Sequence, residues 1–185
     1  MGAEEHDLVR QCLARDPAGL RAFVERFQDV IFGLCFRMLG HRHDAEDVTQ
    51  DVFLRAFRHL ASWDSARPLK PWLLTIAANR CRTALVRRSR QPVAREFAVQ
   101  AAQGSPSGMP ADLAEELNAA LATLREEYRL CFVLFHDQEL GYAEIAELLG
   151  CPIGTVRIWL YRARRELAAI LESRGITGMV HHGLH

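Results

Sequence analysis

The 185-residue sequence has no long apolar run, and its five cysteines form no paired pattern. A membrane-spanning helix needs about 18 or more consecutive apolar residues, so none is predicted. The first residues, MGAEEHDLVR, are acidic and lack the apolar segment of a secretory signal. We therefore expect a protein of the cytoplasm with no direct membrane insertion.

The cysteines are odd in number, widely scattered and without a CxxC pair, which argues against a disulfide framework and against a zinc site. We expect most of them to be small buried side chains; they are Cys12, Cys35, Cys81, Cys131 and Cys151. The sequence also lacks a glycine-rich phosphate loop and a nucleophile-plus-base arrangement. No catalytic residue, metal, cofactor or small-molecule substrate is predicted, so the function should be binding and the protein no enzyme.

The net charge is zero, with 23 basic and 23 acidic residues, but the charges are segregated. Residues 79–90 contain five arginines and no acid, whereas residues 43–51 contain four carboxylates and no Lys or Arg. Segregation of this kind predicts several partners of different charge, and not one neutral surface.

Strand signals are nearly absent, and apolar residues repeat at intervals of three and four along most of the chain. Between the two helical halves, residues 89–112 hold three prolines, three serines and two glycines, a composition typical of a linker. The prediction is an all-α fold of two small helical domains joined by a flexible linker. The expected boundaries are 1–90 for the first domain, 91–111 for the linker, 112–173 for the second domain and 174–185 for a tail.

A helix-turn-helix is predicted at residues 139–167, ELGYAEIAELLGCPIGTVRIWLYRARREL. Gly150 supplies a left-handed turn residue, and Pro152 blocks continuation of the first helix. Ala143, Ile145, Ala146 and Leu149 of the first helix should face inward, as should Val156, Leu160 and Ala163 of the second. A helix of this layout places its first side chains at base edges in the major groove and later arginines at phosphates. The alternative is a helical hairpin with a solvated basic face.

Residues 144–167 resemble the C-terminal DNA-binding region of bacterial sigma factors of the extracytoplasmic-function (ECF) group. Two earlier stretches, HDAEDVTQDVFLRAFRHL and PWLLTIAANRCRTALVRRSR, resemble the polymerase-binding and promoter-melting regions of the same family, in the same order. The resemblance covers about residues 8–171. It implies a transcription initiation factor that binds core RNA polymerase and confers recognition and melting of specific promoter DNA.

The resemblance implies that an acidic face binds the basic clamp-helix coiled coil of the polymerase large subunit. The residues assigned to this contact are Asp44, Asp47, Gln50 and Asp51. A local explanation also exists: Asp44 would be a helix N-cap, Glu46 and Asp47 would lie in the first turn, and Asp51 would pair with Arg55 four residues on.

Melting a duplex requires capture of an unpaired base and a hold on the phosphates of its strand, which aromatic rings and arginines provide. In the resembled family, the loop at residues 64–70 and Asn79 line the pocket for a flipped base of the −10 element. The residues assigned to −10 DNA are Asp64, Ser65, Arg67, Trp72, Asn79, Arg80, Arg82, Arg87 and Arg88. A place in the core is the alternative for Trp72. The family usually has Phe where Leu69 stands and Asp where Thr83 stands, and loss of that acid removes a partner for Arg80 or Arg87.

The residues assigned to −35 DNA are Thr155, Arg157, Ile158, Trp159, Tyr161, Arg162 and Arg165. The family commonly has a small polar residue at position 158 and a basic one at 159. Ile and Trp pack on a thymine methyl but cannot make the bidentate contact of Arg to guanine. We therefore expect a −35 sequence that differs from the commonest one, with Arg157 and Arg162 as the leading contacts and Arg164 and Arg165 on phosphates.

Two other functions are compatible with parts of the sequence. A stand-alone helix-turn-helix repressor would bind duplex DNA as a dimer, but it would leave the acidic face and the Asn79 helix without a role. A sigma mimic that titrates an anti-sigma factor would lack the DNA-contacting arginines, which are present here. The resemblance further implies control by an anti-sigma factor.

Overall fold

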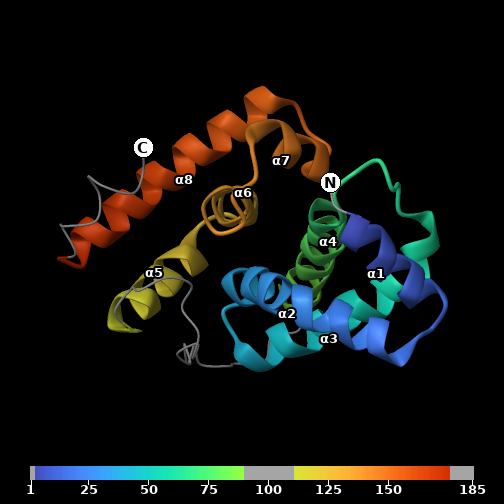
Figure 1. Cartoon of the computed structure of the whole chain (residues 1–185). Helices are drawn as coiled ribbons and strands as arrows, with labels where there is room; N and C mark the ends of the chain where they lie inside the picture. The colour runs from blue at the N-terminus through green and yellow to red at the C-terminus, as the bar shows by residue number, and fades with distance from the viewer. Residues whose placement is uncertain (1–2, 90–110, 176–185) are drawn as a thin grey trace. The chain divides into compact units, whose positions relative to one another are not determined.

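The computed structural model describes residues 3–89 and 111–175, which form α-helices, one 3-10 helix and no strand (Figure 1). The all-helical prediction is confirmed. The elements are α1 (Ala3–Leu13), α2 (Pro17–Leu39), α3 (Arg42–His59), η1 (Leu60–Ser62), α4 (Leu69–Ser89), α5 (Ala111–Thr123), α6 (Glu126–His136), α7 (Tyr142–Leu149) and α8 (Ile153–Ser173).

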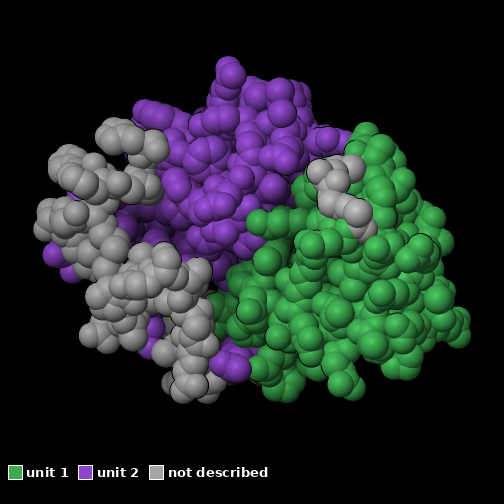
Figure 2. Space-filling model, in the orientation of Figure 1, with its two compact units in different colours: residues 1–36, 43–92 green, residues 37–42, 93–185 purple. Residues whose placement is uncertain are grey.

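The chain divides into two compact units, coloured separately in Figure 2. Unit 1 comprises residues 1–36 and 43–92, and unit 2 comprises residues 37–42 and 93–185. The predicted pair of helical domains is therefore present. Apart from Ala111, where α5 begins, the predicted linker lies outside the described residues, as does the predicted tail after Gly175.

The core of unit 1 is built from aromatic and aliphatic side chains of α2, α3 and α4. Phe23 and Phe27 lie one turn apart on α2, with ring centroids 5.2 Å apart, and Phe23 also lies 5.2 Å from Phe57 of α3. Leu73 and Ala77 of α4 are fully buried. Burying a side chain such as Phe or Leu contributes roughly 1.5–3 kcal/mol, so these faces hold the three helices together.

The core of unit 2 joins α5 and α6 to α8. Its buried residues are Ala120, Leu121, Leu124, Tyr128, Phe132, Ala163, Leu167 and Leu171. The guanidinium of Arg129, itself buried, donates hydrogen bonds to the carbonyls of Ala122 and Leu124 at 3.0 and 3.2 Å. These bonds satisfy carbonyls at the end of α5 that have no partner within the helix.

The turn between α7 and α8 is closed by backbone hydrogen bonds around a left-handed glycine. Gly150 has φ 64° and ψ 37°, and its N–H donates to the carbonyl of Glu147 while the N–H of Cys151 donates to that of Ala146. This pattern is a Schellman motif, which ends α7. Pro152 then caps α8 in an extended conformation. The predicted helix-turn-helix is thus present, with Val156, Leu160 and Ala163 buried as expected.

Candidate functional site

The acidic face predicted on α3 lies near the start of that helix. Gly40, with φ 72°, and His41 alone separate α2 from α3, which therefore begins at Arg42. The predicted N-cap role of Asp44 is wrong, because the helix starts two residues earlier and Asp44 lies within its first turn. The carboxylate still faces the positive end of the helix dipole.

Asp47 and Gln50 are exposed on α3, and Gln50 lines a groove. Asp47 contacts His43 of the preceding turn, whose Nδ1 lies 3.3 Å from an Asp47 carboxylate oxygen. The groove, of about 380 Å³, is lined by α2 and α3 residues, namely Val24, Gln28, Asp29, Phe32, Glu46, Thr49, Gln50 and Phe53. Sequence reasoning missed it, since it forms only where the two helices pack.

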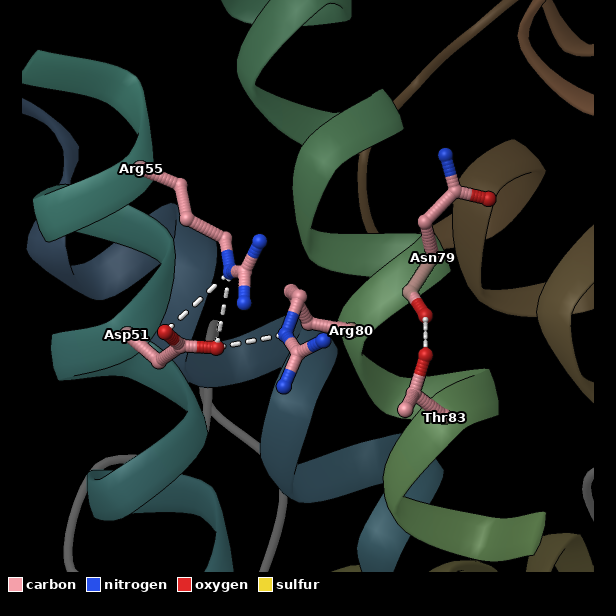
Figure 3. Close-up of polar contacts among 5 residues, drawn as sticks. All are labelled: Asp51, Arg55, Asn79, Arg80 and Thr83. Atoms are coloured by element: carbon pink, nitrogen blue, oxygen red, sulfur yellow. Dashed lines mark hydrogen bonds and ion pairs between the residues drawn. The ribbon is translucent and has the colours of Figure 1, made fainter. Parts of the chain in front are cut away.

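Asp51 differs from its neighbours because its carboxylate is held by two arginines (Figure 3). Arg55 Nε donates to both carboxylate oxygens at 3.1 Å, which confirms the predicted pair along α3. Arg80 Nε, on α4, forms an ion pair with Asp51 Oδ2 at 2.5 Å. Partial burial alone would raise the pKa of Asp51, but the hydrogen bond from Arg55 and the charge of Arg80 outweigh it and lower that pKa.

The −10 residues predicted on α4 fall on different sides of that helix. Asn79 is exposed, and in Figure 3 its side chain projects away from Asp51. Thr83, which replaces the usual acid of the family, donates its hydroxyl to the Asn79 carbonyl at 2.9 Å. The loss of an acid at position 83 was expected to remove a partner of Arg80 or Arg87, and Arg80 has an ion-pair partner from α3, Asp51. Arg87 is exposed and Arg82 and Arg88 are half-buried.

Trp72 is half-buried in the first turn of α4. The degree of burial is compatible with both roles considered for this residue, a core contact and a stacking surface.

The loop that precedes α4 is anchored by α1, a helix that the sequence reasoning did not predict. Asp64, Ser65 and Arg67 are exposed in this loop. His6 Nε2 donates to the Ser65 carbonyl at 3.1 Å, and its ring lies edge-on to buried Trp63 at 5.8 Å. The two contact partners are 59 residues apart, so no local sequence signal could have found this contact.

The exposed surface of α8 combines arginines with two large apolar side chains. Arg157, Arg162 and Arg165 are exposed, and Ile158 and Tyr161 are 54% and 64% exposed. Thr155 is half-buried near the start of the helix. Exposed side chains of this size on the second helix of a helix-turn-helix are suited to a DNA groove.

Three α7 and α8 residues differ from the sequence expectation. Trp159 was expected on an outer face but packs partly against the unit 2 core, because it lies four residues before buried Ala163. Arg164 was expected on phosphate but stacks over Phe135, its Cζ 5.2 Å from the ring centroid. Ala143 was expected to face inward but is exposed, since it lies on the other side of α7 from Ile145.

Arg162 also has a partner within unit 2. Its Nη1 donates to the hydroxyl of Tyr128 on α6 at 2.9 Å, and this hydrogen bond raises the pKa of the guanidinium. The bond orients Arg162 without burying it, so the remaining donors face solvent.

Across residues 3–89 and 111–175, no group of three or more His, Cys, Asp or Glu side chains is placed to hold a metal ion. In the same ranges, no helix is both long enough and apolar enough to cross a membrane.

Comparison with known families gives one match in each half of the chain. Residues 23–91 match the family model of sigma-70 region 2, and residues 114–167 match that of sigma-70 region 4. The ECF RNA polymerase sigma factor SigW of Bacillus subtilis is 30% identical over 173 residues, which cover 86% of this chain and 92% of SigW. The chain belongs to the ECF RNA polymerase sigma factors. These matches confirm the family resemblance seen in the sequence. Sigma factors are transcription initiation factors rather than catalysts.

Other similar proteins agree with this assignment to the ECF sigma factors. The ECF sigma-E factor of Escherichia coli K12 is also 30% identical over 173 residues, covering 86% of this chain and 90% of its own. Among solved structures, RpoE of Bartonella quintana, crystallised with the anti-sigma factor NepR, is similar at a TM-score of 0.71 and 25% identity. That similarity covers 82% of this chain and 96% of RpoE. CnrH, solved with the cytosolic domain of CnrY, shares the fold at a TM-score of 0.66 and 24% identity, over 90% of this chain and 96% of CnrH.

Proposed function

We propose that this ECF sigma factor docks on core RNA polymerase through α3, melts the −10 element with α4 and its preceding loop, and reads the −35 element with α8. The observation that carries the proposal is that the two matched sigma regions fall largely on separate helical units, each of which exposes polar residues of its helices. Two separate DNA-binding units suit a promoter whose −10 and −35 elements are separated along the DNA.

Docking is assigned to Asp44, Asp47 and Gln50 of α3, of which Gln50 lines the groove between α2 and α3. Asp47 is 65% exposed, and its charged contact within the described part of the chain is His43, which carries a positive charge only when protonated. A basic partner helix would therefore gain a carboxylate without first breaking a strong ion pair. Asp51 belongs to the predicted set as well, but both of its oxygens are already engaged by arginines.

Melting is assigned to Asn79, the loop residues Asp64, Ser65 and Arg67, and the arginines of α4. An exposed amide presents donors and an acceptor to the edge of an unpaired base, and the contact of α1 with the loop keeps the loop ordered. Arg82, Arg87 and Arg88 follow on the same helix and would hold the phosphates of the captured strand. Trp72 would supply a stacking surface at the start of α4.

Reading of the −35 element is assigned to the exposed residues of α8. Arg157 lies in the N-terminal part of the helix, where a recognition helix meets base edges, and Ile158 and Tyr161 offer apolar contact to thymine methyls. Arg162 and Arg165, farther along, would meet phosphates. Trp159 and Thr155 would contribute mainly by shaping the helix surface, since both are half-buried.

We also propose that an anti-sigma factor regulates this protein. RpoE of Bartonella quintana was solved with an anti-sigma factor, and we extend that mode of control to this chain. The protein would act in the cytoplasm, where core polymerase works, as a binding factor without catalytic activity of its own.

A mixing experiment tests the proposed function. Purified protein is added to sigma-free bacterial core polymerase, and co-elution is measured together with transcription from a library of promoter fragments. Co-elution with new, sequence-restricted transcripts is the expected result. Duplex binding by the protein alone, without co-elution, would contradict it and favour a repressor.

Charge reversal tests the docking assignment. Asp47→Arg should weaken core binding at least tenfold and leave helix content unchanged, because it places a positive charge against a basic partner. Asp7→Arg is the matched control, since Asp7 is also an exposed acid of unit 1 but lies on α1, outside the acidic face predicted on α3. Equal core affinity of the two variants would refute the docking surface.

A further inference from the structure

Asp51 and Arg80 connect the helix assigned to polymerase docking with the helix assigned to promoter melting. Asp51 lies on α3, within the acidic face, and Arg80 lies on α4, directly after Asn79. Their ion pair joins residues 29 positions apart in the sequence, and Figure 3 shows it bridging the two helices. The pair is therefore a tertiary contact between two functional surfaces of unit 1.

The carboxylate of Asp51 is poorly available for a partner protein. Its side chain is 34% exposed, against 65% for Asp47, and Arg55 holds both of its oxygens while Arg80 contacts one. A basic helix of another protein would have to displace two arginines before reaching it. Asp47 offers a carboxylate without that competition.

Arg80 in turn is held in place by this carboxylate. Its side chain is 27% exposed, and position 83, one turn farther on, carries a threonine whose hydroxyl bonds to the Asn79 carbonyl of the same helix. The acid that restrains Arg80 thus comes from α3 and not from α4. Since Arg80 follows Asn79, fixing one side of α4 against α3 sets the rotation at which the other side presents Asn79.

We propose that Asp51 is a positioning residue for promoter melting: it acts through Arg80 to set the orientation of the α4 face that bears Asn79, and it is not a docking contact. The inference rests on the proposed function of unit 1. Two acids one turn apart on α3 then have separate roles: Asp47 binds the polymerase, and Asp51 positions α4.

The test compares Asp51→Asn with Asp47→Asn in the full chain. For each variant, the affinity for core polymerase is measured first. The assembled holoenzyme is then titrated with a fluorescent single strand carrying the −10 sequence of a promoter selected in the mixing experiment. Asp51→Asn should weaken strand binding by about five- to tenfold, a size within the range of coupling in a shared polar network, and change core affinity by less than about twofold. Asp47→Asn should show the reverse split.

A double-mutant cycle shows whether Asp51 acts through Arg80. Arg80→Gln should weaken strand binding by itself, and Asp51→Asn added to it should cause little further loss, because the residue through which it acts is gone. Asp51→Glu, which keeps the charge, should restore part of the binding. Thermal unfolding of each variant separates these effects from a general loss of folding, and Asp51→Asn with Arg80→Met removes both charges of the contact between α3 and α4.

Two results would overturn the inference: loss of core affinity by Asp51→Asn equal to that by Asp47→Asn, or additive effects of the Asp51 and Arg80 substitutions. Failure of the proposed function is distinguishable, because the unmodified protein would then produce no promoter-specific transcripts with core polymerase.

Discussion

Gly150 and Gly154 lie four residues apart, and the structure predicts that alanine has opposite effects at the two positions. Gly150 has φ 64°, in the left-handed region, whereas Gly154 lies in the first turn of α8. A Cβ added at either position meets no heavy atom within 4 Å, so steric clash plays no part. The backbone conformation alone separates the two substitutions.

The magnitudes follow from the two conformations. A left-handed non-glycine residue costs roughly 1–2 kcal/mol, so Gly150→Ala should destabilise unit 2 by about that amount. In a helix, Gly→Ala at a compatible position stabilises by about 0.4–1 kcal/mol, chiefly by restricting the unfolded chain. The two variants should therefore differ by about 2 kcal/mol in the free energy of unfolding of unit 2.

Segment-resolved hydrogen exchange on the full chain measures this difference, because it reports on α7 and α8 separately from unit 1. A Gly150→Ala variant that is as stable as the unmodified protein would refute the left-handed cap and the turn built on it.

Further predictions concern titration, the loop before α4 and DNA reading. Burial, with the adjacent charge of Arg164, lowers the pKa of His136 from 6.5 to about 4, so unit 2 should lose stability between pH 6.5 and 4. As the pH falls, His136 is protonated in the unfolded chain before it is protonated in the folded one, and the resulting loss of stability is at most about 3 kcal/mol. His136→Gln should abolish this loss, as measured by unfolding curves at acid pH. His6→Ala should reduce open-complex formation several-fold at unchanged core affinity, as measured by permanganate footprinting, whereas unchanged footprints would argue against anchoring by α1. Arg157→Ala should cost about 1–3 kcal/mol and relax specificity at one −35 position, whereas Arg165→Ala should weaken all duplexes alike and lower the salt slope of binding by about one. Equal salt slopes for these two variants in duplex titrations would refute that division.

The helix-turn-helix illustrates what local sequence signals can predict. Gly150, Pro152 and the repeat of Val156, Leu160 and Ala163 act within a few residues, and a turn conformation or a helical face depends on little else. The same reasoning was less accurate at the ends of helices and at the borders of their buried faces. It placed the start of α3 at Asp44, and it assigned Trp159 to an outer face although that side chain lies on the flank of the buried stripe.

The assignment of the acidic face and of the α4 residues came from resemblance to a family and not from geometry. Such a resemblance transfers residue positions but not the contacts among them. At Thr83, where the chain departs from its family, the resemblance predicted a missing partner for Arg80 or Arg87, and the structure gives Arg80 a partner from another helix.

By itself, the sequence determined the all-helical fold, the two halves, the turn at Gly150 and the buried stripe of α8, because helix period and turn chemistry are local properties. Only the tertiary structure decided that His6 holds the loop at Ser65, that Arg162 bonds to Tyr128 and that Asp51 is shared with Arg80. These contacts join residues 29 to 59 positions apart. They depend on how helices cross and which rotamers meet, which no spacing along the chain encodes.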